Sequence, residues 1–501
     1  MTEALQHLAR AHGIALEHDD NWGRVHRVSE VTLRAVLSAM HVDATDDDAV
    51  ARALIDVERA RWQRRLAPLS VVRSPARPWR LRICLPAEAA TRPLTCRIID
   101  EAGIEHIHPV APGEAIEVSR ARIDDASLIE FELALDVSLP DGYHEIALLA
   151  EGETLAQGAL AVVPRACYRS PSLRDGRRVW GAAVQLYGLR SGRNWGIGDF
   201  TDLAALIEQW GAEGAMVVGV SPLHALYSHD PARASPYCPS SRHFLNILFL
   251  DVEAIPEFEH CAEACAYVAS PAVRHQLAKL RAVPLVDYPR VANAKLTALA
   301  MVYEQALRDA RAGASPRAAQ FAAFKAAAGE RLRRYALFEA LQAHFFRCDP
   351  EVWGWPVWPD AYRHPAAPAV RHFEVEHAER VDFHAWLQWQ AALQRANVAA
   401  RARKHGLELG LYADLAVSVD RGGADAWANQ DLYALGAGVG APPDAFNLKG
   451  QDWGLPPMIP QRLRDAGYEP FIAILRANMR DAGALRIDHV MGLLRLYWVP
   501  S

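Results

Sequence analysis

This 501-residue sequence is poor in cysteine, and the cysteines it has form no recognisable framework. The seven residues are odd in number and scattered, which disfavours a set of disulfides and suits a reducing compartment. Cys261 and Cys265 lie at helical spacing beside His260, but a zinc site needs a second ligand pair, and none follows at a suitable spacing. We therefore predict free thiols, no metal or other cofactor, and a cytoplasmic location.

Long apolar runs and an excess of positive charge are also absent. The opening stretch MTEALQHLARAHGIALEHDD lacks the apolar region of a signal peptide, and no later stretch predicts a membrane span. Lysine and arginine total 54 against 60 aspartates and glutamates, which gives a net charge of −6. This balance provides no field to attract polyanions, so we expect neither nucleic acid nor a membrane as partner.

The chain is long enough for more than one core, and its pattern changes twice. Residues 1–65 are predicted to be a small helical module, in which Ser29 caps a helix with apolar residues at helical spacing. Residues 66–168 alternate with a period of two and include a predicted hairpin in LPDGYHEIALLAEGETLAQGALAVV, which indicates an all-β sandwich. Residues 169–501 are predicted to form an α/β domain.

In that domain one unit recurs: a helix, a glycine, an apolar strand and a polar tip. It appears in DFTDLAALIEQWGAEGAMVVGVSPL, again where a helix stopped at Gly406 leads to LELGLYADLAV, and again where a helix stopped at Gly483 leads to ALRIDHV. With VWGAAVQLYGL these units predict four parallel strands joined by helical crossovers. Residues 224–380 are then inserted subdomains, largely helical.

Polar residues at the carboxyl ends of parallel strands are typical of a (β/α)8 TIM-type barrel, of which only the first half would be present here. An open doubly wound sheet would place a ligand at the same strand ends, so it remains the alternative.

Arg486 and Asp488 are two apart on a predicted strand, so their side chains leave the same face. A neighbouring guanidinium favours the ionised form of a carboxylate, which a nucleophile attacking an anomeric carbon requires. A structural ion pair would show the same spacing.

The stretch GAPPDAFNLKGQDWGLPPM places Asp444, Gln451 and Trp453 on a predicted loop rich in glycine and proline. An indole face and hydrogen-bonding side chains suit a sugar ring, although a surface loop would contain the same turn residues. Tyr237 in ASPYCPSSRHFLN offers a similar aromatic surface or a packing residue. The tryptophans of EVWGWPVWPD are predicted to pack together as an anchor for the insertion.

These stretches, together with NWGIGDFTDL and YEPFIAILRANMRDAGALRIDHVMGLLRLYWVP, resemble the bacterial 4-α-glucanotransferases, or amylomaltases, of glycoside hydrolase family 77. The resemblance runs from about residue 175 to the end and implies an enzyme that acts on maltooligosaccharides and other α-1,4-glucans. It implies that Asp488 is the nucleophile and Arg486 its partner. The other residues that match the family's substrate contacts are Tyr237, Asp414, Asp444, Gln451, Trp453 and His489.

The mechanism implied by the resemblance is retaining: one carboxylate attacks the anomeric carbon while a second, about 5 Å away, protonates the leaving oxygen. The family takes that acid and a further aspartate from later strands, so we expect this chain to be a fragment that is inactive alone. The alternatives are a retaining α-glucan hydrolase, which would create reducing ends, and a non-catalytic glucan-binding fragment.

Overall fold

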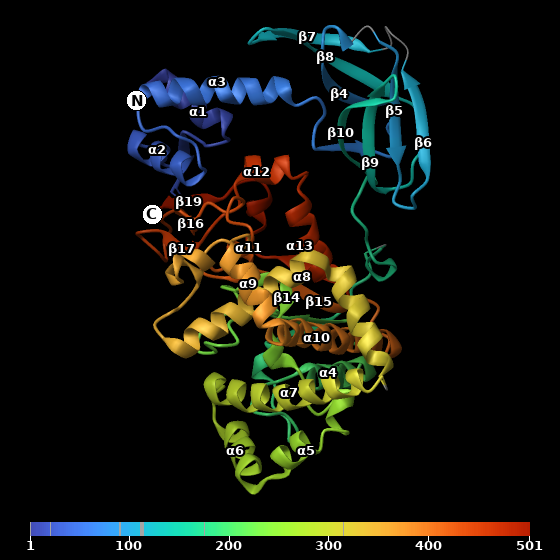
Figure 1. Ribbon diagram of the computed structural model, residues 1–501, viewed down its shortest axis with the longest axis vertical. Helices are drawn as coiled ribbons and strands as arrows, with labels where there is room; N and C mark the ends of the chain where they lie inside the picture. The colour runs from blue at the N-terminus through green and yellow to red at the C-terminus, as the bar shows by residue number, and fades with distance from the viewer. Residues whose placement is uncertain (1, 21, 90–91, 111–114, 175, 314) are drawn as a thin grey trace.

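The computed structural model describes residues 2–20, 22–89, 92–110, 115–174, 176–313 and 315–501. The N-terminal module and the β-sandwich lie at one end of the long axis, and helices α5 (Ala262–Ala269) and α6 (Pro271–Ala282) lie at the other (Figure 1). Within the described ranges, no helix is both long and apolar enough to span a bilayer.

The N-terminal module contains three helices that begin at polar caps, together with a short hairpin that the sequence pattern did not predict. Ser29 accepts a hydrogen bond from the backbone N–H of Thr32 at 3.1 Å, which confirms the predicted cap. Apolar residues of the helices, among them Leu5, Leu33 and Val50, form a small core. The elements are α1 (Glu3–Ala11), β1 (Glu17–Asp19), β2 (Val25–Arg27), α2 (Glu30–Ala39) and α3 (Asp47–Gln63).

The next region is a β-sandwich whose two sheets enclose alternate side chains of each strand. One sheet has the order β3-β10-β9-β5-β6 and the other the order β4-β8-β7. The predicted hairpin is confirmed, since β9 and β10 pair antiparallel. The strands are β3 (Leu69–Arg73), β4 (Trp79–Pro86), β5 (Leu94–Ile99), β6 (Glu105–Val110), β7 (Ile116–Ile123), β8 (Ala126–Leu135), β9 (Gly142–Ala150) and β10 (Glu153–Val163).

The described strands β11, β12, β15 and β18 form a parallel sheet in that order, which confirms the predicted parallel strands and their helical crossovers. Helices α10 and α13 pack against this sheet, and α4 packs against α10. These elements are β11 (Gly181–Val184), α4 (Phe200–Ala212), β12 (Val217–Val220), α10 (Ala378–Lys404), β15 (Gly410–Leu415), α13 (Glu469–Met479) and β18 (Ala484–Ile487).

Gly406 and Gly483 were predicted to end two of the crossover helices, and this prediction is wrong for one of them. Gly406 follows α10 with φ +81°, as expected for a glycine after a helix. Gly483 is not the stop of α13: the helix ends at Met479, and Asp481 takes the left-handed conformation. Gly483 instead allows a close approach, because a Cβ there would collide with the carbonyl of Leu409.

The insertion between β12 and β15 is largely helical, as predicted. Trp355 and Trp358 are buried in its core, but Trp353 is 43% exposed, so the prediction that all three tryptophans pack together is wrong. The additional elements are β13 (His224–Ala225), β14 (Ser241–Leu245), α7 (Tyr288–Arg311), α8 (Pro316–Cys348) and α9 (Pro368–Glu376). Helix α8 is kinked at Gly329, whose φ is 58°.

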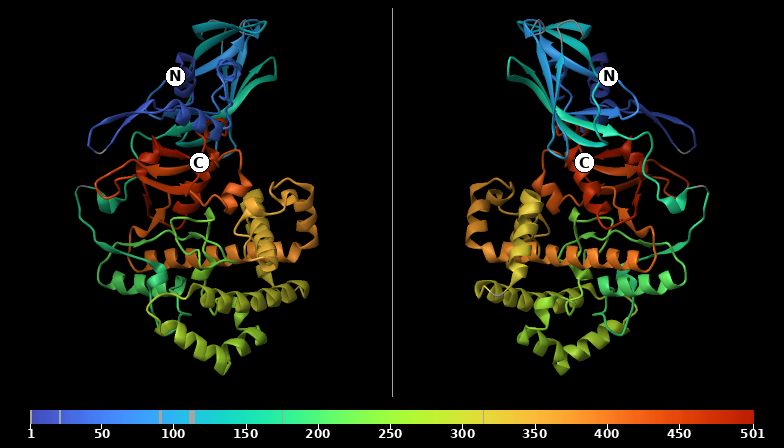
Figure 2. Two further views of the ribbon diagram at one scale, coloured as in Figure 1. Left: turned by 90° about the vertical axis from the view of Figure 1, so that its left-hand side faces the viewer. Right: turned by 90° about the vertical axis from the view of Figure 1, so that its right-hand side faces the viewer.

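A second, antiparallel sheet has the order β17-β16-β19 and lies between the parallel sheet and the N-terminal module. Figure 2 shows the C-terminus in this sheet directly below that module. Residues of α2 and its C-cap share one buried cluster with this part of the chain, namely Val36, Ala39, Met40, Ala434, Ala437 and Ile459. The elements are α11 (Ala424–Ala428), β16 (Ala437–Ala441), β17 (Gln451–Leu455), α12 (Pro460–Asp465) and β19 (Tyr497–Pro500).

Candidate active site

The carboxyl ends of β15 and β18 bring two aspartates to the same arginine. In the parallel register Asp414 is paired with Arg486, and Asp488 follows directly after β18. Arg486 donates from Nη1 to Asp414 Oδ2 at 2.6 Å and from Nη2 to Asp488 Oδ1 at 2.6 Å. The guanidinium therefore bridges the two carboxylates and fixes their separation.

Asp414 is the more enclosed of the two aspartates, with a side chain that is 6% exposed. Its Oδ2 also accepts a hydrogen bond from the Tyr237 hydroxyl at 3.1 Å, while its Oδ1 is buried and has no partner among the described residues. Burial raises the pKa of Asp414, and the charge of Arg486 and the hydroxyl of Tyr237 oppose this shift. Asp414 is therefore placed to hold Arg486 and Tyr237.

Asp488 is more open, with a side chain that is 27% exposed. Its backbone N–H donates to the carbonyl of Leu415 at 3.1 Å, which joins the turn after β18 to the end of β15. One carboxylate oxygen is engaged by Arg486, and no described group donates to the other. The arrangement thus presents an oriented carboxylate oxygen that is accessible to a ligand.

Tyr237 lies on the loop between β13 and β14 and is 42% exposed. Asp420, which follows β15, anchors this loop by accepting from Arg233 Nη2 at 2.5 Å and from the thiol of Cys238 at 3.2 Å. The guanidinium of Arg233 also lies 3.8 Å from the centroid of the Tyr227 ring. These contacts position the Tyr237 ring beside the two aspartates.

Trp453, Gln451 and His489 form a second group next to Asp488. The Trp453 and His489 rings meet edge to face with centroids 5.1 Å apart. The indole N–H of Trp453 donates to Gln451 Oε1 at 3.2 Å. The prediction that Gln451 and Trp453 lie on a loop is wrong, because both belong to β17, which pairs with β16.

Asp444 does lie on a loop, but its carboxylate is occupied locally. Its Oδ1 accepts from the backbone N–H groups of Phe446 at 2.8 Å and Asn447 at 2.6 Å, an Asx turn that shapes the loop. Phe446 is 94% exposed at the tip. No described hydrogen bond joins Asp444 to the bridged aspartates.

The sequence pattern did not reveal the residues that form hydrogen bonds with the backbone just after β15. Arg242 on β14 donates from Nη1 to the carbonyl oxygens of Ala416 at 3.1 Å and Val417 at 2.8 Å. His224 Nε2 accepts from the N–H of Ala416 at 3.2 Å, and burial lowers the pKa of His224 to about 3. These partners are more than 170 residues apart in sequence, so no local signal could have paired them.

Comparison with known proteins supports the same interpretation. A family model described as 4-alpha-glucanotransferase matches residues 184–501, and a model of the MalQ N-terminal β-sandwich domain matches residues 65–164. The chain belongs to the 4-alpha-glucanotransferase family, glycoside hydrolase family 77. The resemblance inferred from the sequence motifs is therefore confirmed, as are the enzyme class and the combination of an α/β fold with an N-terminal β-sandwich.

Individual members of the 4-alpha-glucanotransferase family match over most of this chain. A 4-alpha-glucanotransferase of Mycobacterium tuberculosis is 38% identical over 100% of this chain and 68% of its own length. One of Haemophilus influenzae is 40% identical over 72% of this chain and 52% of its own length. The crystal structure of amylomaltase from Corynebacterium glutamicum matches with a TM-score of 0.80 and 29% identity, covering 99% of this chain and 66% of that one. The chain thus spans about half to two thirds of these relatives.

Proposed function

We propose that the strand-end residues act in a 4-α-glucanotransferase that moves segments of α-1,4-glucan between maltooligosaccharides by a retaining, covalent mechanism. The observation that carries the proposal is Asp488 itself, a partly exposed carboxylate with one oxygen held by Arg486 and the other unoccupied by described donors. Its free oxygen would attack the anomeric carbon, and the bond from that carbon to the leaving oxygen would break. The 4-hydroxyl oxygen of an acceptor then attacks that carbon, the ester bond to Asp488 breaks, and the hydroxyl proton passes to the conjugate base of the general acid.

The neighbouring residues have distinct roles in this proposal. Arg486 keeps Asp488 charged and oriented, and Asp414 is a positioning residue that holds Arg486 and Tyr237. The rings of Tyr237, Trp453 and His489 and the amide of Gln451 supply sugar contacts, and the loop shaped by Asp444 lies over the bound glucan. A covered acceptor site favours transfer over hydrolysis because it keeps water from the intermediate.

The general acid that protonates a natural leaving group is assigned to none of the residues described above. Loss of that proton transfer costs roughly 10²- to 10⁴-fold in rate. We therefore expect this chain by itself to cleave an activated glycosyl fluoride, whose leaving group needs no proton, and to leave maltooligosaccharides unchanged.

Two finer features also belong to the proposal. The parallel order β11-β12-β15-β18 with helical crossovers, and the gathering of polar residues at the carboxyl ends of these strands, support a (β/α)8 barrel architecture for the α/β domain. All seven cysteines are free thiols, which supports action in the reducing environment of the cytoplasm.

Incubation of the chain with maltotriosyl α-fluoride tests the proposal. We expect fluoride release and a covalent maltotriosyl adduct, detected by intact-mass spectrometry and mapped to the peptide that contains Asp488. Fluoride release with no adduct on that peptide, or an adduct on another carboxylate, would contradict the assignment. Maltotriose binding without any fluoride release would favour a glucan-binding protein, and free maltotriose as the sole product despite an added acceptor would favour a hydrolase.

A further inference from the structure

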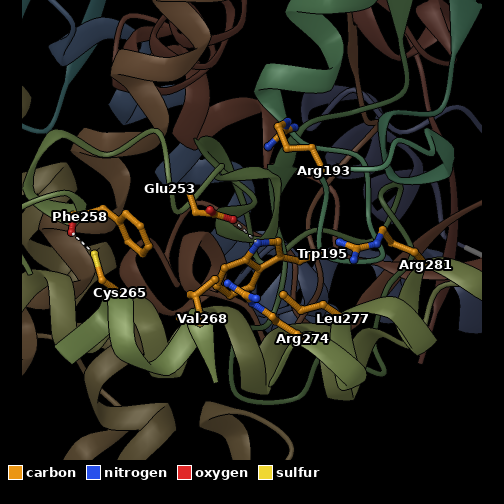
Figure 3. Close-up of a pocket in the computed structure, with 10 residues that line it drawn as sticks. Arg193, Trp195, Glu253, Phe258, Cys265, Val268, Arg274, Leu277 and Arg281 are labelled. Carbon is orange, nitrogen blue, oxygen red and sulfur yellow. Dashed lines mark hydrogen bonds between the residues drawn. The ribbon is translucent and has the colours of Figure 1, made fainter. Parts of the chain in front are cut away.

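A cleft of about 490 Å³ lies away from the strand-end residues, between α5, α6 and the loop that precedes α4. Figure 3 shows the side chains that line it, and none of the bridged aspartates or their sugar-contact neighbours is among them. The walls of this cleft therefore need an explanation of their own.

Residues at helical spacing on α5 and α6 line the cleft. On α6, Arg274, Leu277 and Arg281 line it at positions i, i+3 and i+7, which lie on one side of a helix. On α5, Cys265 and Val268 line it at positions i and i+3. The result is an apolar floor with two guanidinium groups along one wall (Figure 3).

The arginines of the cleft differ in how fully they are paired. Arg193 is neutralised by Asp199, Asp202 and Asp251, whose oxygens lie 2.5, 2.9 and 2.8 Å from its nitrogens. Arg281 donates from Nη1 to the carbonyl oxygen of Asn194 at 3.0 Å and meets no described carboxylate within ion-pair distance. No ion pair or side-chain hydrogen bond joins Arg274 to any described residue, so both α6 arginines retain unused donors.

Two further residues of the lining, Trp195 and Glu253, indicate what a ligand must offer besides negative charge. The indole of Trp195 is only 2% exposed, so it forms a floor and is too covered to stack against a glucan ring. Its N–H donates to Glu253 Oε1 at 3.0 Å, and Glu253 is an exposed residue of the lining. This carboxylate would accept hydrogen bonds from hydroxyl groups and would repel a second anionic group.

We propose that this cleft binds a small organic phosphate monoester with a hydroxylated body. The phosphate lies between Arg274 and Arg281, because a guanidinium matches phosphate oxygens with parallel N–H donors. The hydroxyl groups reach Glu253 across the Trp195 floor. Because the whole chain carries a net charge of −6, general electrostatic attraction would not concentrate such an anion, and the two arginines must supply the recognition.

Isothermal titration of the purified chain with glucose 6-phosphate at low ionic strength tests the site, with inorganic phosphate and glucose as separate titrants. We expect saturable binding of glucose 6-phosphate and weaker binding of inorganic phosphate. The titration with glucose should be the same for the unsubstituted chain and for Arg274→Gln. Arg274→Gln should weaken glucose 6-phosphate binding by about tenfold or more, since a charge-assisted hydrogen bond is lost. Ala269→Trp, which fills the cleft from the exposed end of α5, should do the same.

Two control variants separate this site from others. Lys279→Gln removes a cation from α6 that does not line the cleft and should leave binding unchanged. Asp488→Asn should also leave it unchanged, so failure of the catalytic assignment and failure of this one are distinguishable. The proposal is overturned if glucose 6-phosphate does not saturate the chain, if Lys279→Gln weakens binding as much as Arg274→Gln, or if Asp488→Asn abolishes binding.

Discussion

The β-sandwich and the parallel sheet each shield an aspartate, but they satisfy its oxygens in opposite ways. Asp100 follows β5 and accepts from the N–H groups of Ala102 and Ile104, at 3.0 and 2.9 Å, and pairs with His106 at 3.1 Å. Asp414 is buried to a similar extent, but its hydrogen-bond donors are Tyr237 and Arg486, which are 177 and 72 residues away in the sequence. The donors to Asp100 come from its own turn and the next strand, whereas the donors to Asp414 are brought to it only by the tertiary fold.

The pKa values of the two aspartates move in opposite directions because hydrogen bonds dominate at Asp100 and burial dominates at Asp414. The hydrogen bond to His106, followed by that to the N–H of Ile104, lowers the pKa of Asp100. Burial raises the pKa of Asp414 despite Arg486 and Tyr237, because one oxygen remains buried without a described partner. A fully satisfied carboxylate stabilises a turn, while incomplete satisfaction at strand ends is typical of functional sites.

The largest expected effect is at Asp488, which Arg486 joins to Asp414. Asp488→Asn should lower the rate of fluoride release from maltotriosyl α-fluoride by on the order of 10³-fold or more, because the amide cannot form the glycosyl ester. A fluoride electrode measures the rate. Asp100→Asn, its counterpart in the sandwich, should retain the full rate; equal loss in both variants would refute a specific role for Asp488.

Removal of the bridging guanidinium should have the next largest effect. Arg486→Ala eliminates two charge-assisted hydrogen bonds, and we expect fluoride release to fall by about a hundredfold. Steady-state kinetics should show the loss mainly in kcat. Arg80→Ala, which removes an arginine that pairs with Glu132 across β4 and β8, should leave the rate unchanged. A loss of similar size in that variant would attribute the effect to general destabilisation.

A smaller effect is expected at the hydroxyl that contacts Asp414. Tyr237→Phe keeps the ring but removes one hydrogen bond, so we expect a rise in KM or a fall in rate of about three- to tenfold. Kinetics with maltotriosyl α-fluoride measure both quantities. The matched control is Tyr143→Phe, at a tyrosine of β9 with 41% exposure against 42% for Tyr237. A full loss of activity in Tyr237→Phe would mean that the hydroxyl has a chemical role.

The last prediction concerns thermal stability and its dependence on pH. The folded-state pKa of His224, about 3, lies below its ordinary value of 6.5, so the folded chain binds fewer protons than the unfolded chain between these values. The stabilisation is present above pH 6.5 and declines as pH falls, by at most about 1.4 kcal/mol per pH unit for this one residue. Thermal unfolding followed by tryptophan fluorescence at pH 6.5 and 5 should show the decline.

The His224→Gln variant sharpens that measurement, because an amide oxygen can still accept from the N–H of Ala416 but does not titrate. We expect its unfolding temperature to depend less on pH between 6.5 and 5 than that of the unsubstituted chain. Asp100→Asn should leave this pH dependence unchanged, since a lowered carboxylate pKa affects stability only at more acidic pH. A pH dependence identical in all three proteins would exclude His224 as its source.

Several elements of the fold could be predicted because their signals are local. Ser29 and Asp199 cap helices with their own side chains, and Gly406 follows a helix in the conformation that glycine favours. The antiparallel sheet of β16, β17 and β19 was missed because its strands have only four or five residues and each contains glycine or proline, which are depleted in strands. Its pairing depends on register across the chain.

For the candidate site, the motifs identified Arg486 and Asp488 as a pair, and the structure places them in contact. They did not indicate that Asp444 would be satisfied by its own turn, or that Arg233 and Asp420 would anchor the Tyr237 loop. The roles of the site residues remain predictions that the variants above test.

The amino-acid sequence by itself determined the helices, the parallel strands and the chemical kinds of residue at their ends, because periodicity, caps and glycines act over a few neighbours. Only the tertiary structure decided which side chains share Arg486 and which carboxylate oxygen stays free. The physical reason is that parallel pairing joins strands through long crossovers, so the partners of a strand-end residue are fixed by register and packing and lie far away along the chain.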